Sequence, residues 1–193
     1  NLNGNAKCMV ASERTGLNFL QMMSGIAYKT YSYQQELLDS KTVLLDTRKT
    51  IPGLRVAQKY AVLCGGGGNH RLGLFDAYLL KENHITAAGS IKAAVQRARS
   101  AHPEMAVEVE VESIAELEQA IAASADIAMI DNFSLADTER AVALARGILK
   151  LEASGGIDAK SITEIAKKGV DYISIGDLTK TVTPLDLSMR FQD

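Results

Sequence analysis

Charged residues and glycines recur along the 193-residue chain in six short groups, and each group directly follows an aliphatic run. Arginine and lysine bind carboxylates and phosphates, while glutamate and aspartate balance positive charge or bind metal ions. A site that combined both signs could therefore bind a multiply charged anion. The six groups are Arg48 and Lys49; Lys81, Glu82, Asn83 and His84; Glu110 and Glu112; Asp131 and Asn132; Ser154, Gly155 and Gly156; and Gly176 and Asp177.

The elements that must position these groups are predicted by aliphatic runs that alternate with amphipathic stretches of about a dozen residues. Ser113 and Glu116 match a capping box, Pro52 suits the first turn of a helix, and Asp158 suits an N-cap. Repeated strand–helix units predict an α/β fold with a parallel sheet, either doubly wound or forming a closed or partly open barrel. The predicted strands cover residues 42–46, 77–81, 106–112, 126–131, 150–154 and 171–175.

The third predicted strand favours the barrel. In residues 107–112 valine and glutamate alternate, so the three valines share one face and Glu108, Glu110 and Glu112 share the other. A doubly wound sheet is covered by helices on both faces and leaves no room for a row of carboxylates. In a barrel the valines would meet the outer helices and the glutamates would face the interior. Buried carboxylates are costly unless cations or metal ions neutralise them.

Enzymes with this architecture build their active sites at the carboxyl ends of the barrel strands. Contact with water explains any one polar strand end, but six in succession favour a catalytic rim. The turns Ser154–Gly156 and Ile175–Asp177 would let backbone N–H groups approach a phosphate. Glycine also serves the geometry of strand-to-helix turns, so either turn alone is weak evidence.

Four consecutive glycines, Gly65 to Gly68, precede Asn69, His70 and Arg71. Such a run has a large conformational entropy cost, so it requires an explanation. A flexible linker is one interpretation, although a linker is seldom followed at once by Asn-His-Arg and a strand of the same domain. We favour a loop that delivers His70 and Arg71 to an anion.

Composition bounds the class of protein. A hydrophobic content of 47% with 23% charged residues is typical of one globular domain. The net charge of −2 gives no general attraction to nucleic acid or to anionic membranes. Two cysteines outside any metal motif fit a reducing compartment, and no apolar run approaches the ~18 residues of a membrane helix, so we expect a cytoplasmic protein. The opening residues Asn1 to Asn5 suggest that an N-terminal segment is missing.

Seven segments, in this order along the chain, strongly resemble quinolinate phosphoribosyltransferases. Each segment alone is modest evidence, whereas together they are highly specific and cover essentially the whole chain. They are Glu13–Leu20, Leu44–Thr50, Gly65–Arg71, Leu80–His84, Glu108–Glu112, Ile130–Phe133 and Leu187–Phe191.

The resemblance implies transfer of phosphoribosyl from phosphoribosyl pyrophosphate to quinolinate, which gives nicotinate mononucleotide, CO2 and pyrophosphate in NAD biosynthesis. It also implies a parallel β/α barrel that follows an N-terminal α/β sandwich domain, most of which this chain lacks. Residues 1–30 would be a remnant of that domain with a connecting helix, and residues 31–193 the catalytic barrel with a C-terminal extension.

The resemblance further implies roles for particular residues. The implied catalytic residues are Lys49, Lys81, Glu110 and Asp131, and Glu110 and Asp131 would also serve Mg2+, directly or through the substrate. The same four residues would bind substrate together with Arg14, Thr47, Arg48, His70 and Arg71, while Ser154, Gly155, Gly156, Ile175, Gly176 and Asp177 would hold a phosphate. Arg14 would reach the active site of a neighbouring subunit, which implies a homodimer or a higher homo-oligomer.

Several alternatives remain open. Lys81 could form a Schiff base, although glutamates around it oppose the lowered pKa that this requires. His84 could cap its loop rather than bind substrate. The protein could act on nicotinate or another substrate, or be a non-catalytic barrel that binds phosphate. Asp177 stands where a small apolar residue is usual in the family, and Tyr28 where threonine is usual.

Overall fold

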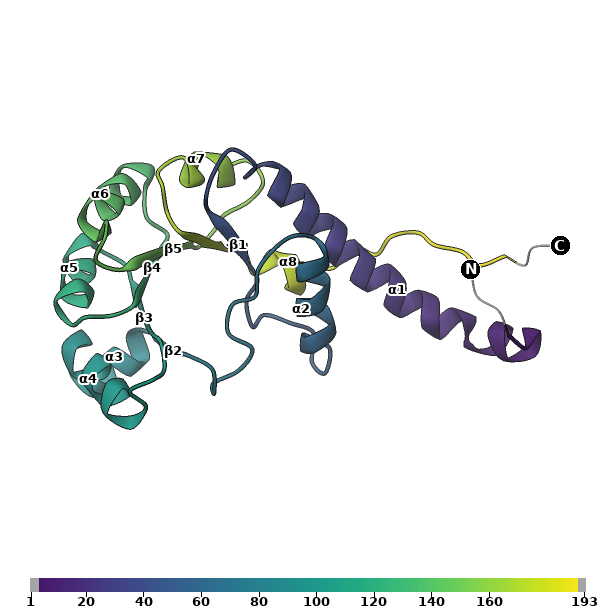
Figure 1. The fold of residues 1–193 in the computed structure, drawn as a ribbon, viewed down its shortest axis with the longest axis horizontal. Helices are drawn as coiled ribbons and strands as arrows, with labels where there is room; N and C mark the ends of the chain where they lie inside the picture. The colour runs from purple at the N-terminus through teal and green to yellow at the C-terminus, as the bar shows by residue number, and fades with distance from the viewer. Residues whose placement is uncertain (1–3, 191–193) are drawn as a thin grey trace.

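A computed structural model describes residues 4–190 (Figure 1). Residues 1–3 of the opening segment lie outside the described range, as does Phe191 of the segment Leu187–Phe191. None of the helices in the described part is long and apolar enough to span a bilayer. The elements along the chain are α1 (Ala6–Gln35), β1 (Val43–Leu45), α2 (Arg55–Cys64), β2 (Tyr78–Leu80), α3 (Glu82–Ala88), α4 (Ile91–Ala101), β3 (Val107–Val111), α5 (Ile114–Ala122), β4 (Ile127–Asp131), α6 (Leu135–Ala145), β5 (Lys150–Ser154), α7 (Ile162–Ala166), β6 (Tyr172–Ser174) and α8 (Asp177–Lys180).

The six strands form one parallel sheet in the order β1-β6-β5-β4-β3-β2. The sheet curves, and helices α3 to α7 cover its convex side (Figure 1). Within the described chain β1 and β2 pair with other strands but not with each other, so the barrel is open between them. A single bridge joins Leu45 to Gly68, and the segment that follows runs across this open side to β2 (Figure 1). The prediction of a parallel barrel, closed or partly open, is confirmed, and the structure shows the partly open form.

Strand β3 carries the alternation that the sequence predicts. Val107, Val109 and Val111 are fully buried in the core between sheet and helices. Glu108 is buried and Glu110 is partly buried, whereas β3 ends at Val111 and Glu112 is exposed. The prediction of a row of interior carboxylates therefore holds for two glutamates and is wrong for the third, because Glu112 lies beyond the barrel wall.

Two of the predicted helix starts need correction. The Ser113 hydroxyl accepts a hydrogen bond from the Glu116 N–H (3.3 Å) and caps α5 as predicted. Pro52 lies in a separate turn that ends at Gly53, a residue with φ of +79°, and α2 begins only at Arg55. Asp158 accepts from the N–H groups of Lys160 (2.9 Å) and Ser161 (3.0 Å), so it closes the turn before α7 rather than capping that helix.

Helix α1 is the longest element, and its N-terminal half extends away from the barrel (Figure 1). Its C-terminal half packs closely against α2 and against the segment after α8. A Cβ at Gly25 would lie 2.1 Å from the Thr183 carbonyl oxygen, and one at Gly65 would lie 2.4 Å from that of Ala27. Glycine at both positions therefore permits the contact between α1 and the barrel. Nothing in the structure explains Tyr28, which is exposed on α1.

Candidate functional site

A cavity of about 460 Å3 lies at the carboxyl ends of the strands. Every strand end contributes to it, as the polar strand ends predict. Nine of the predicted residues line it, and Arg55, Leu79, Met129 and Ser174 line it in addition. The nine are Thr47, Arg48, Lys49, His70, Arg71, Lys81, Glu110, Asp131 and Ser154. A larger cavity of about 730 Å3, lined by residues of α5, α6, the loops that follow them, the start of β5 and the segment before β6, contains none of the predicted residues.

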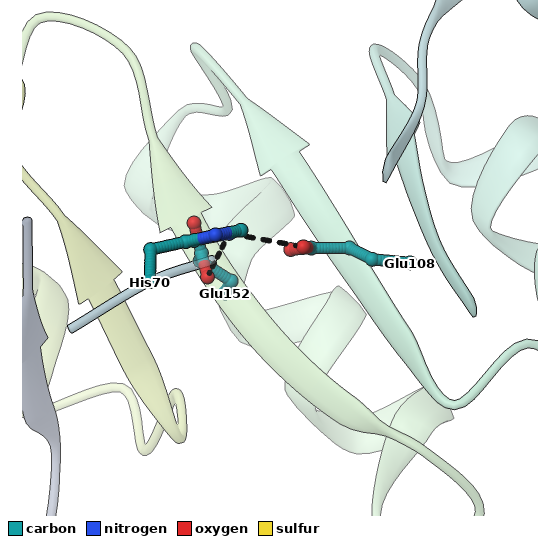
Figure 2. A group of neighbouring side chains, drawn as sticks. All are labelled: His70, Glu108 and Glu152. Carbon is teal, nitrogen blue, oxygen red and sulfur yellow. Dashed lines mark ion pairs between the residues drawn. The ribbon is translucent and has the colours of Figure 1, made fainter. Parts of the chain in front are cut away.

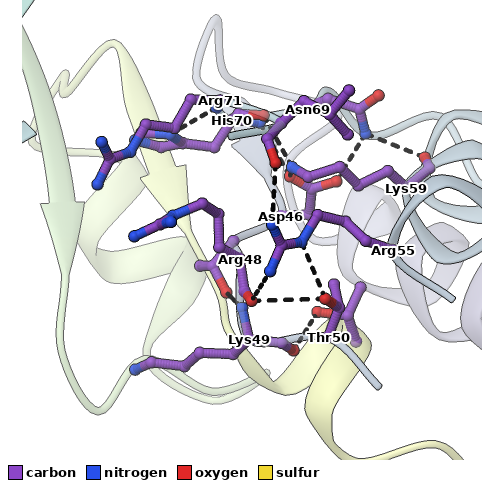
Figure 3. A network of polar contacts seen from close by, with 12 residues as sticks. Asp46, Arg48, Lys49, Thr50, Arg55, Lys59, Asn69, His70 and Arg71 are labelled. Carbon is purple, nitrogen blue, oxygen red and sulfur yellow. Dashed lines mark hydrogen bonds and ion pairs between the residues drawn. The ribbon is translucent and has the colours of Figure 1, made fainter. Parts of the chain in front are cut away.

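The loop after β1 presents Thr47, Arg48 and Lys49 to the cavity, and its shape depends on Arg55. The Arg55 guanidinium donates to the Thr50 hydroxyl (3.1 Å) and to the carbonyl of Arg48 (3.3 Å) (Figure 3). A third bond reaches the carbonyl of Leu72 (3.1 Å) and ties this loop to the one that carries Arg71. Sequence reasoning missed Arg55. The available signal was a cation in the first turn of a helix, where the helix dipole disfavours positive charge.

The glycine-rich run ends in a loop that a buried network holds in place (Figure 3). Asp46 is fully buried, and it pairs with the buried Lys59 of α2. It also accepts from the Asn69 amide (2.6 Å) and from the His70 N–H (2.9 Å). Burial raises the pKa of Asp46 above its ordinary value, and the bonds from Lys59, the His70 N–H and the Asn69 amide offset only part of this rise. Sequence reasoning gave Asp46 and Lys59 no role, although together they set the course of the loop.

His70 points into the barrel between two buried glutamates (Figure 2). Its Nε2 atom lies 3.0 Å from a carboxylate oxygen of Glu108 and 3.4 Å from one of Glu152. Burial alone would lower the pKa of His70, but hydrogen bonds to the two carboxylates raise it to about 10. Burial in turn raises the pKa of Glu108. The partnership of Glu152 with His70 was not predicted, because it joins residues 82 positions apart.

Lys81 and Glu110 form an ion pair at the cavity wall. The Lys81 ammonium is thus placed against a carboxylate, an arrangement that suits binding of an anion beside it rather than a Schiff-base role. His84 accepts a hydrogen bond at Nδ1 from the Lys81 N–H (3.0 Å) and so caps α3. Of the two interpretations of His84, the structure supports the cap.

The two predicted phosphate turns pack closely against neighbouring residues, and the first of them requires glycine at position 155. Gly155 has a φ of +90°, and a Cβ there would lie 2.3 Å from the Asn132 side-chain oxygen. A Cβ at Gly176 would lie 2.9 Å from Cδ of Lys49. Both turns therefore lie against residues of the cavity rim, although only Ser154 of the six predicted phosphate ligands lines the cavity itself. Their binding role stays a prediction.

Asp177 does not face the cavity in the way a phosphate ligand would. Its carboxylate pairs with Lys29 of α1, which also donates to the Asp177 carbonyl (2.8 Å). The bond from Lys29 holds the pKa of this carboxyl below its ordinary value. The unusual aspartate is thus explained by a contact between α1 and α8.

Arg14 is exposed on α1 and does not line the cavity of its own chain. Its predicted role in a neighbouring subunit's site stays a prediction.

The cavity carries more positive than negative charge. Arg48, Lys49, Arg55, Arg71 and Lys81 line it together with only two carboxylates, Glu110 and Asp131. Burial lowers the pKa of Arg71, and nearby Arg48 lowers it further. Cations this crowded repel one another until an anion binds, so the cavity is suited to a ligand with several negative charges.

Comparisons with known proteins agree with this geometry. A family model described as "Quinolinate phosphoribosyl transferase, C-terminal domain" matches residues 26–190. A probable nicotinate-nucleotide pyrophosphorylase (carboxylating) from Bacillus subtilis is 46% identical over 189 residues, which cover 97% of this chain and 65% of the relative. The nicotinate-nucleotide pyrophosphorylase structure from Francisella tularensis is 57% identical with a TM-score of 0.94, covering 96% of this chain and 66% of that one. The chain thus spans about two thirds of the length of these relatives.

Proposed function

Because the chain belongs to the quinolinate phosphoribosyltransferase family, we propose that the protein joins quinolinate to phosphoribosyl pyrophosphate. The products are nicotinate mononucleotide, CO2 and pyrophosphate. One observation carries this proposal. Cations from the ends of β1 and β2 and from the glycine-run loop (Gly65–Arg71) line one cavity together with the carboxylates of Glu110 and Asp131.

The charge of the cavity suits both substrates. Quinolinate has two adjacent carboxylates, and phosphoribosyl pyrophosphate has several more negative charges. Arg48 and Arg71 provide planar donors that match carboxylates, and Lys49 and Lys81 provide point charges. A monocarboxylate such as nicotinate would leave part of this positive charge without a partner. The set of cations therefore favours the diacid.

The chemistry requires position and charge rather than a covalent nucleophile. The pyridine nitrogen forms a bond to the ribose C1, and the bond from C1 to pyrophosphate breaks with its electron pair on the leaving oxygen. The carboxylate next to the ring nitrogen then leaves as CO2. Its electron pair stays on the ring carbon, where the positively charged nitrogen stabilises it until a proton binds. In this proposal Lys49 and Lys81 stabilise the negative charge that develops during both steps.

Glu110 and Asp131 fit a role towards Mg2+. They lie on the neighbouring strands β3 and β4, and both line the cavity. Carboxylate oxygens are the ligands that Mg2+ prefers, directly or through water and a substrate phosphate. When bound, Mg2+ would offset the charge of the leaving pyrophosphate. The turns Ser154–Gly156 and Ile175–Asp177 are proposed to hold the 5'-phosphate of the ribose through their backbone.

An assay on the full-length protein tests the function. The protein is incubated with Mg2+, phosphoribosyl pyrophosphate and either quinolinate or nicotinate, and both CO2 and mononucleotide are followed. We expect equal amounts of CO2 and mononucleotide from quinolinate and no product from nicotinate. Turnover of nicotinate alone would identify a related transferase instead. Tight phosphate binding without any turnover would identify a non-catalytic barrel.

A further inference from the structure

A second cavity, of about 310 Å3, lies on the other side of the His70 ring from the candidate active site. His70 and Arg71 line both cavities, whereas Glu108 and Glu152 line only the second. These four side chains therefore form a layer that separates the two cavities. The two glutamates lie beneath the active site and do not reach the substrate cavity.

The contacts of the imidazole connect this layer to the active site. On one side, Nε2 faces the carboxylates of Glu108 (3.0 Å) and Glu152 (3.4 Å) (Figure 2). On the other side, Nδ1 accepts a hydrogen bond from the backbone N–H of Arg71 (2.7 Å). The Arg71 guanidinium in turn donates to the Ala77 carbonyl (3.3 Å). The ring therefore links two buried carboxylates to the arginine on the cavity wall.

The burial of these glutamates is costly and has no evident structural benefit. Glu108 is 3% exposed and Glu152 is 1% exposed, and the His70 ring lies between them. One oxygen of each carboxylate lacks a hydrogen-bond partner in the described chain. Burying two charges around one partner costs several kcal/mol, and apolar residues in their place are often neutral or stabilising. A role in positioning His70 explains why carboxylates stand here.

The same three side chains could in principle ligate a metal ion, since their donor atoms lie within 4.8 Å of one another. A metal on Nε2 would displace the proton that Nε2 shares with the carboxylates and would require a proton on Nδ1. Nδ1 instead faces a donor, the Arg71 N–H. With Nδ1 acting as an acceptor, the ring proton lies on Nε2, where it faces the two carboxylates. The geometry thus favours hydrogen bonds over a metal.

We propose that Glu108 and Glu152 are positioning residues, which hold the His70 ring and thereby set Arg71 against a carboxylate of the acceptor. This inference rests on the proposed function. In this proposal the buried layer supports the part of the cavity that binds quinolinate, and not the part that binds phosphate. Loss of either carboxylate should therefore weaken quinolinate binding selectively.

The isosteric substitutions Glu152→Gln and Glu108→Gln test the proposal in the full-length protein. Glu112→Gln is the matched control, because Glu112 follows the same strand but is exposed. For Glu152→Gln we expect the KM for quinolinate to rise by about tenfold, the loss of one charge-assisted hydrogen bond. The KM for phosphoribosyl pyrophosphate should change little. Glu112→Gln should match the wild type.

Combining Glu152→Gln with Arg71→Lys shows whether the glutamate acts through the arginine. We expect Glu152→Gln to add little to the quinolinate KM of Arg71→Lys, because the positioned group is already replaced. Independent, multiplying effects in the double variant would overturn the proposal. An unchanged quinolinate KM in both glutamine variants would also overturn it, as would an equal rise for both substrates.

Elemental analysis of the dialysed wild type distinguishes the metal alternative. One equivalent of Zn2+ or Mn2+ that is lost in Glu152→Gln would assign the cluster to a metal and overturn the positioning role. Absence of turnover in the wild type would contradict the proposed function itself, which is a different result from an active wild type with unaffected variants.

Discussion

At the scale of single residues, the site contains positively and negatively charged side chains that lie in direct contact. Lys81 projects from the end of β2 and pairs with Glu110 of β3, and both line the cavity. The lysine side chain is 41% exposed, so the pair contributes little to the stability of the fold. Its value lies in the charge that it presents to a bound anion.

Lys81→Ala should therefore separate activity from stability. We expect kcat/KM for quinolinate to fall by roughly 10- to 100-fold, since a hydrogen bond from a charged group contributes about 1.5–3 kcal/mol. The thermal midpoint should stay within about 2 °C of the wild type. Steady-state kinetics and thermal denaturation measure the two quantities. A midpoint that falls steeply together with activity would show that Lys81 is part of the core.

His70 gives the fold a pH dependence of known sign. Its pKa is raised to about 10, above the ordinary value of 6.5 that it regains on unfolding. A group with a raised pKa contributes stability that is fully present below the unfolded pKa and is lost as the pH rises through the folded one. The free energy of unfolding should therefore decline between pH 7 and pH 10. Urea denaturation should show this decline in the wild type and a flatter profile in His70→Gln, and equal profiles would contradict it.

At the scale of elements, the network beneath the glycine-run loop joins β1, α2 and the loop itself. Asp46 at the end of β1 accepts from Lys59 of α2, from the Asn69 amide and from the His70 N–H. Lys59 also donates to the His70 carbonyl (2.7 Å). The buried ion pair therefore fixes the course of the loop together with its glycines, of which Gly66 has a φ of +88° and Gly65 packs closely against Ala27.

Removing one partner of this pair should be worse than removing both. Lys59→Met leaves the Asp46 carboxylate buried without its cation, and we expect a loss of about 3–5 kcal/mol in the free energy of unfolding. Adding Asp46→Asn should restore part of that loss, because the stranded charge disappears. Urea denaturation of both single variants and the double variant measures the coupling. Strictly additive losses would show that the two side chains do not act as a pair.

The same network shows how far the sequence predicts the structure. Aliphatic runs place all six strands within two residues of their bounds, because strand formation depends on local pattern. Polar strand ends bring nine predicted residues to one cavity, because parallel strands share a carboxyl edge. Lys59 was missed because its partner is 13 positions away, and Pro52 was misplaced because a turn ending at Gly53 precedes α2. Side-chain pairs between residues far apart in the sequence cannot be predicted from the local pattern of residues.

At the scale of the whole molecule, the barrel is open between β1 and β2, and the segment that follows Gly68 crosses that side (Figure 1). Helix α1 extends beyond the barrel and exposes apolar side chains, among them Val10, Phe19 and Leu20. Exposed apolar side chains of this size favour a further contact surface. Arg14 lies on the same extended half of α1, and the cavity of its own chain is lined without it. We propose that it serves the site of a partner subunit.

Mixed assemblies test this arrangement, because two impaired variants can then complement each other. In a dimer of one Arg14→Ala chain and one Lys81→Ala chain, the site that keeps Lys81 receives the intact Arg14 of its partner. The other site lacks both residues. Random mixing makes half of the dimers mixed, each with one complete site, so activity should return to about a quarter of the wild-type value. The two variants should be unfolded together, refolded and assayed against each variant refolded alone. If Arg14 acts within its own chain, or only on the stability of α1, no mixture contains a complete site and activity stays at the level of the separate variants.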